Sequence, residues 1–130
     1  MPTIESYCAD DVYDPPAYSQ GVRVKGAETI LFLSGQVSYD NSGGVAHAGD
    51  FKAQARAAFE ALKSLIEHEG GGLENIVKLN SYVVDMGYRN DLALVRGEFF
   101  PGRAPASTLV EVSALALPDW LVEIEAIAVL

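Results

Sequence analysis

Two carboxylates near the end of the chain, Glu123 and Glu125, have the residue type and spacing needed for acid–base chemistry. They lie in the apolar run 121–129, which predicts a β-strand, and strand side chains alternate, so both carboxylates belong to one face. The neighbours Leu121 and Ile127 on that face are apolar, so Glu123 is expected to be partly buried, an environment that suits a carboxylate to general acid or base work. Glu123 is therefore the first candidate for a catalytic residue.

Both glutamates also have a purely structural interpretation. Paired glutamates on a strand are compatible with a solvated or salt-bridged pair that takes no part in chemistry. Glu125 in particular either contributes to a cleft or forms an ion pair with Arg23 or Lys25 across the sheet.

Other candidate chemistries receive little support. Ser107 is not expected to be a nucleophile, because no histidine stands near it in the sequence. The two histidines, His47 and His68, have no further ligands at metal-binding spacing around them, so no metal site is expected.

Three short motifs carry a family resemblance. They are YSQGV at 18–22, LSGQ at 33–36, and VEIEA at 122–126, the last following a Leu-Pro turn. Each motif alone is weak, but they occur in one order with matching elements between them, over about residues 16–129. The chain resembles the reactive intermediate deaminases, the Rid or YjgF family.

The resemblance implies a fold and an activity. The fold is like that of a small bacterial chorismate mutase, assembled as a homotrimer with sheets inside, helices outside and a cleft at each subunit interface. The implied activity is hydrolysis of enamines and imines such as 2-aminoacrylate to a keto acid and ammonia. No metal or organic cofactor is implied, and the partner is a small metabolite bound at the interface.

The resemblance also assigns site residues. The glutamate that positions the attacking water falls on Glu123, a tyrosine of the cleft wall falls on Tyr18, and the loop residues fall on Ser34, Gly35 and Gln36. These assignments place the ligand between the last strand and the loops that carry the motifs.

One assignment departs from the pattern of the deaminases. Their arginine, which binds the substrate carboxylate through two parallel hydrogen bonds, falls on Ser107. Loss of such a contact weakens carboxylate binding by roughly 2 to 5 kcal/mol. Two arginines are candidate substitutes for binding substrate: Arg103, four residues upstream in the same loop, and Arg96, which is expected to face outward from the second helix. The departure predicts an altered substrate preference, and a noncatalytic trimer that binds a small metabolite or a protein remains the alternative function.

Composition excludes several classes of protein. The net charge of −9 disfavours nucleic acid as a partner, and this applies to the ribonuclease activity that some family members are named for. No apolar run approaches the roughly 20 residues that span a bilayer, and no signal peptide is visible at the first residues. The single cysteine, Cys8, agrees with a reducing compartment, so a cytoplasmic protein is expected.

The order of predicted elements indicates an α+β fold in a single domain, 1–130. Two helices are expected to pack on one face of a mixed sheet, and the first begins at an N-cap, Asp50, and ends at the glycines 70–72. The turn Gly26-Ala27-Glu28 predicts a hairpin between the second and third strands. The expected strands are 3–6, 21–25, 29–33, 76–85, 105–112 and 121–129, and the expected helices are 50–69 and 88–100.

The last strand predicts an oligomer. Both of its faces are largely apolar, whereas a sheet with helices on one side normally has a polar open side. A second copy of the chain is the expected cover, in a closed symmetric assembly.

Overall fold

The computed structural model describes residues 1–130, and its elements follow the predicted order. The strand expected at 29–33 is longer, and a two-residue strand precedes the one expected at 21–25. The strands are β1 (Thr3–Tyr7), β2 (Tyr18–Ser19), β3 (Gly21–Lys25), β4 (Ile30–Gln36), β5 (Ile76–Val83), β6 (Ala104–Glu111) and β7 (Val122–Val129). The helices are α1 (Phe51–His68) and α2 (Arg89–Phe99), with short 3-10 turns at Leu73–Asn75 and Met86–Tyr88.

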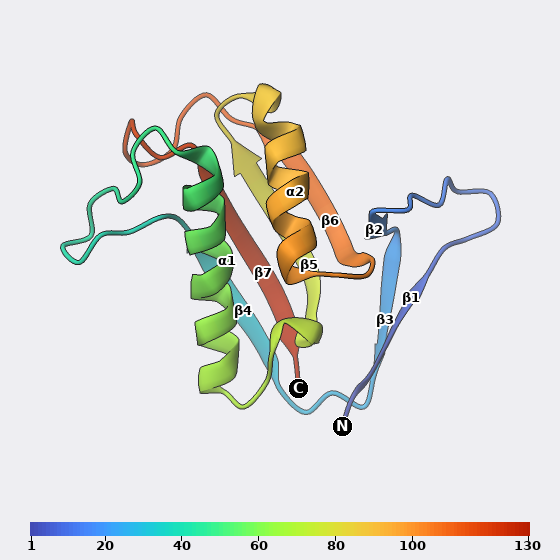
Figure 1. Cartoon of the computed structure of the whole chain (residues 1–130). Helices are drawn as coiled ribbons and strands as arrows, with labels where there is room; N and C mark the ends of the chain where they lie inside the picture. Colours follow the sequence, from blue (N-terminus) through green and yellow to red (C-terminus); the bar gives the residue numbers. More distant parts are fainter.

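Five strands form a mixed sheet in the order β2-β6-β5-β7-β4. Strand β5 runs parallel to β6 and antiparallel to β7, and β7 is antiparallel to β4. Both helices cover the same face of this sheet (Figure 1). The predicted α+β fold is therefore confirmed, with β5 inserted between the two C-terminal strands.

The core lies between the helices and the sheet. Alternate residues of β7, Val122, Ile124, Ala126 and Ala128, are buried against one face of α1, which contributes Phe59 and Leu62 among others. Leu65 was predicted on that helical face but is 42% exposed. The alternation of β7 sets its other residues, including both glutamates, on the face away from the helices.

The boundaries of α1 have local causes. Asp50 caps the helix by accepting a hydrogen bond of 3.1 Å from the backbone N–H of Ala53, as predicted. The helix ends where Gly70 adopts a φ of +90°, a conformation that side chains disfavour. Arg56 of α1 donates two hydrogen bonds of 2.9 Å to Glu98, which ties α1 to α2. This ion pair fixes the position of α2 relative to α1.

The predicted hairpin between residues 21–25 and 29–33 is not formed. Strand β3 pairs with β1 instead, in a two-stranded sheet that we call the N-terminal arm, and β4 pairs with β7. The arm stands apart at one side of the molecule, and the chain then crosses below the sheet to reach β4 (Figure 1). On this path the N–H groups of Glu28 and Thr29 donate to the carbonyl of Leu130. The sequence marked a change of chain direction near Gly26, but the hairpin turn and the pairing that it predicted are not formed.

The face of the sheet away from the helices is open. Phe32 is 77% exposed and Ile30 is 57% exposed, although both are large and apolar. These two side chains alternate along β4 with Leu31 and Leu33, which pack against the core. Neither helix is long and apolar enough to cross a membrane.

Candidate functional site

The predicted site residues form two separate clusters. Within one chain, these clusters lie on opposite faces of the sheet. One cluster surrounds Glu123 on β7, and the other surrounds Ser107 on β6. In the register of β5 and β6, Ser107 lies beside the core residue Leu79, so it belongs to the helix side of the sheet. Glu123 lies beside Tyr82 and alternates with the buried Ile124, so it belongs to the open side.

The first cluster joins Glu123 to the end of β4. A Cβ atom at Gly35 would overlap with the carboxylate of Glu123, so glycine is the residue that allows this approach. Gln36 pairs with Ile124, next to Glu123, and its side-chain amide donates to the carbonyl of Ser34 at 3.1 Å. The structure therefore places Gly35 against Glu123, with Gln36 and Ser34 next along the strand, and the carboxylate makes no hydrogen bond within the chain.

Glu125 lies on the same face and is hydrogen-bonded to two neighbouring side chains. Its Oε1 accepts hydrogen bonds from the hydroxyl of Tyr82 at 2.5 Å and from the amide of Asn80 at 3.1 Å. The hydrogen bond to Glu125, together with burial, raises the pKa of Tyr82. The ion pair considered between Glu125 and Arg23 is not formed, because Arg23 binds Glu5 at 2.8 Å.

A small cavity adjoins this cluster. It has a volume of about 280 Å³ and is lined by Phe32, Ser34, Asn80, Glu125 and Ile127, with backbone neighbours. Its lining combines apolar side chains with the amide of Asn80 and the carboxylate of Glu125. The open face of the sheet therefore presents an amide on β5 and a carboxylate on β7 beside the exposed Phe32 of β4.

The second cluster lines a larger cavity between α2 and β6, which we call the α2–β6 cleft. The cleft has a volume of about 570 Å³ and contains Tyr18 and Ser107, two of the residues assigned from the sequence. Arg89, Asn90 and Arg96 of α2 also line it. Tyr18 reaches the cleft because β2 pairs with the start of β6 at Ala104.

Arg96 does not face outward as predicted from the sequence. It lines the α2–β6 cleft, is partly buried, and forms no ion pair. Burial lowers the pKa of Arg96, and the neighbouring Tyr18 opposes that effect. An arginine that remains charged in a partly desolvated cleft, with no carboxylate of the chain beside it, is suited to bind an anion.

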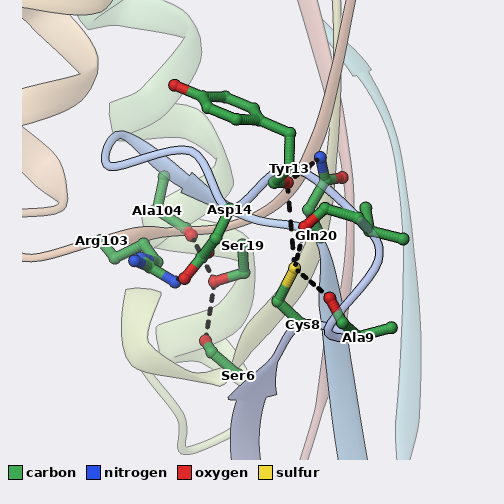
Figure 2. A network of polar contacts seen from close by, with 10 residues as sticks. Ser6, Cys8, Ala9, Tyr13, Asp14, Ser19, Gln20, Arg103 and Ala104 are labelled. Atoms are coloured by element: carbon green, nitrogen blue, oxygen red, sulfur yellow. Dashed lines mark hydrogen bonds and ion pairs between the residues drawn. The ribbon is translucent and has the colours of Figure 1, made fainter.

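Arg103, the other candidate substitute, is engaged elsewhere. Its guanidinium donates to Asp14 at 2.9 Å, in the loop that leads from β1 to β2 (Figure 2). It borders a separate cavity with Ile4 and Phe100 rather than the α2–β6 cleft. The prediction that Arg103 takes the place of the missing arginine is therefore not supported by its position.

Two contributors to the site were missed in the sequence. Arg89 and Asn90 lie in the first turn of α2, where a helix N-terminus favours anions, and they face the cleft beside Arg96. Position 96 follows Leu92 by four residues, and this spacing sets Arg96 on the face of α2 that packs on the sheet. That spacing was the signal in the sequence from which the direction of Arg96 could have been predicted.

No group of three or more His, Cys, Asp or Glu side chains in residues 1–130 is arranged to hold a metal ion.

Comparison with known proteins gives consistent relatives. A family model described as Endoribonuclease L-PSP matches residues 12–130. A RutC family protein of Pyrococcus horikoshii is 38% identical over 111 residues, which are 85% of this chain and 85% of that protein.

Solved structures resemble the whole chain to different degrees. A crystal structure of YyfB of the conserved Rid protein family, from Yersinia pestis, has a TM-score of 0.85 at 28% identity and covers 98% of both chains. Yeast Mmf1 has the same identity and the same coverage of both chains, but a TM-score of 0.72. At equal coverage, the lower score means that some part of the chain is placed differently in Mmf1.

Proposed function

Because this chain belongs to the Rid/YjgF family, whose model is described as Endoribonuclease L-PSP, we propose that it hydrolyses a small enamine or imine that carries a carboxylate. The α2–β6 cleft binds the carboxylate, and Glu123 orients the attacking water. The two clusters lie on opposite faces of one chain, so a complete site takes one cluster from each of two copies in a homotrimer.

The observation that carries this proposal is the position of Arg96. A guanidinium without a partner lines the same cleft as Ser107, where the deaminases that this chain resembles carry their arginine. An arginine from a neighbouring element can supply the same planar pair of N–H donors to a carboxylate. Arg89 adds positive charge at the rim of the cleft.

The reaction needs little from the protein beyond binding and water activation. An enamine such as 2-aminoacrylate takes up a proton at its terminal carbon and becomes an imine. Water, oriented by Glu123, adds to the imine carbon and gives up a proton to the carboxylate, which returns it to the nitrogen. The hydroxyl group then gives up its remaining proton and becomes the keto group as the carbon–nitrogen bond breaks, so that ammonia leaves and a keto acid remains.

A coupled assay tests the proposal. A serine or threonine dehydratase generates the enamine, and keto-acid release is measured with and without this protein. Arg96→Gln is expected to lower kcat/KM by roughly 10- to 150-fold, because a hydrogen bond to a charged group is worth about 1.5–3 kcal/mol. Arg103→Gln is the matched control, since Arg103 is paired with Asp14 outside the cleft, and it should leave kcat/KM unchanged.

The outcomes separate the leading function from its alternatives. Full activity of Arg96→Gln would refute the role of Arg96. If the wild-type protein binds pyruvate, seen by line broadening in NMR, but accelerates no release, the noncatalytic metabolite-binding trimer is the better description. Ribonuclease activity has less support, because a net charge of −9 repels a phosphate backbone.

A further inference from the structure

The edges of β3 and β4 are among the strand edges of this molecule that have no partner. Strand β4 is the last strand of the five-stranded sheet, and β3 is paired only with β1. Each therefore presents a row of backbone N–H and C=O groups that no neighbouring strand satisfies. Along β4 the exposed side chains of Ile30 and Phe32 add an apolar surface to that edge. A long apolar edge strand of this kind is a template for pairing with another chain.

The two free edges belong to segments whose sequence favours pairing with each other. Residues 21–25 and 29–33 are rich in β-branched and apolar residues, and Gly26-Ala27-Glu28 between them is a hairpin signal. In the structure this turn is opened into an exposed crossing, with Gly26 at a φ of +74°. The strands of the predicted hairpin are both present, but not against each other.

Hydrogen bonds hold the arm at the β2 edge of the sheet, whereas the predicted hairpin would need it at the β4 edge. Ser19 Oγ donates to the carbonyl of Ala104 at 3.0 Å and lies 2.7 Å from Ser6 Oγ of β1 (Figure 2). The N–H of Ala104 donates to Ala17 at 3.1 Å. Strands β2 and β4 are the two opposite edges of the sheet, about 19 Å apart at about 4.8 Å per strand. In this arrangement β3 cannot reach its own β4.

We propose that β3 of one copy pairs antiparallel with the free edge of β4 of a second copy, so that the N-terminal arm is exchanged between subunits. The pairing that the sequence specifies within one chain is then made between two chains, which is how domain swapping forms oligomers at low cost. Each copy gives an arm at one edge of its sheet and receives an arm at the other. Such a head-to-tail contact forms a ring when the rotation between successive copies closes, and three copies would close it in the proposed homotrimer.

The faces of the two strands match in this pairing. Val22 and Val24 alternate with the basic Arg23 and Lys25 on β3. When the valines lie beside Leu31 and Leu33 of the receiving strand, both apolar sets lie on the helix side. The basic side chains then lie on the open side, the side that carries Glu123 and Glu125.

The exchange also joins the two clusters of the candidate site. In an antiparallel pair, the start of β3 lies beside the end of β4. Tyr18 stands three residues before β3, and Gly35 and Gln36 end β4. The cleft with Tyr18 and Arg96 of the donor copy is therefore brought to Glu123 of the receiving copy. The strand pairing itself rests on the backbone and does not depend on the proposed function.

Cysteine cross-linking tests the exchange. Two variants are made in a Cys8→Ser background, one with Arg23→Cys and one with Phe32→Cys, and they are co-expressed with tags of different mass. Both positions are exposed, and facing residues of paired strands have Cβ atoms close enough for a disulfide. A second pair, Lys25→Cys with Ile30→Cys, repeats the test in the same register if the first pair folds poorly.

The result expected is a band on a non-reducing gel that contains one copy of each tag and disappears on reduction. As a control, both substitutions of a pair are placed in one chain, and this variant should give cross-linked dimers and larger species. Loss of both thiols in that variant without any change of mass would mean that β3 folds back on its own β4, which overturns the proposal. Absence of a disulfide with both pairs, in protein that melts like the Cys8→Ser parent, would overturn it as well.

Discussion

Gln54, in the first turn of α1, accepts a hydrogen bond of 2.8 Å on its side-chain oxygen from the backbone N–H of Leu121, the residue before β7. Its amide nitrogen donates to the carbonyls of Asp119 at 2.9 Å and His47 at 3.2 Å. The side chain is fully buried. One amide therefore fixes the entry of the strand that carries Glu123 against the helix that covers it.

Replacement of this amide should destabilise the fold. Gln54→Leu removes the partners of the Leu121 N–H and the Asp119 carbonyl, whereas the His47 carbonyl still accepts from Asp50, and we expect the free energy of unfolding to fall by about 2–4 kcal/mol. Urea denaturation measures the loss. Gln20→Leu is the control, because Gln20 is exposed and makes a single hydrogen bond to Tyr13, and an equal loss there would contradict this interpretation.

Removal of the charge at Glu123 should stop turnover without unfolding the protein. Glu123→Gln keeps the shape of the side chain, so we expect kcat to fall by roughly 10²- to 10⁴-fold while the melting temperature and the subunit mass stay unchanged. Glu125→Gln is the comparison, since Glu125 is bound by Tyr82 and Asn80. Full activity of the Glu123 variant would show that Glu123 has a structural role only. Loss of the assembly would favour the noncatalytic trimer that binds a small metabolite or a protein.

An arginine placed at position 107 should replace Arg96. Both positions line the α2–β6 cleft. In an Arg96→Ala background, Ser107→Arg is expected to recover a large part of the lost kcat/KM, because it returns a guanidinium to the cleft. The control substitution is Ser107→Gln in the same background, which restores volume but no charge. Equal recovery in both double variants would show that volume, rather than charge, was missing.

The stability of the protein should depend on Tyr82 at alkaline pH. The hydrogen bond to Glu125 raises the pKa of Tyr82 in the folded state above its unfolded value of about 10. The protonated hydroxyl therefore stabilises the fold fully below about pH 10, and this contribution is lost as the pH rises through the folded pKa. The melting temperature should fall in this range more steeply for the wild type than for Tyr82→Phe. Parallel curves for the two proteins would contradict the assignment.

The assembly should contain three chains. Light scattering at micromolar concentration is expected to give three times the chain mass of 13.9 kDa, because the apolar side chains of the open sheet face need cover. A monomer mass would contradict both the proposal of a site shared between copies and the proposal of strand exchange.

The regular elements were predictable because their causes are local. The period of α1, its cap at Asp50 and the alternation along β7 all act within a few residues. Arg96 was expected to face outward, whereas its spacing of four residues from the buried Leu92 sets it toward the sheet. Gln54 was overlooked because its burial depends on hydrogen-bond partners that lie 65 and 67 residues away in the sequence.

The position of the N-terminal arm could not be predicted from local sequence patterns. The residues around Gly26 specify which strands prefer each other, but the same preference is satisfied within one chain or between two. Bonds from Ser19 and Ala17 to Ala104, 85 or more residues along the chain, decide where the arm lies. Contacts of such sequence separation are not encoded in any short window.

If the arm is exchanged as proposed, the unpaired edge of β4 also sets the order in which this protein is completed in a cell. A newly made chain can complete its helices and central strands alone, but its last strand edge waits for another molecule. The slow step of maturation then becomes an encounter, with a rate that rises with the amount of protein made. Until that encounter, Phe32 and Ile30 are the surface by which chaperones would recognise an unfinished chain.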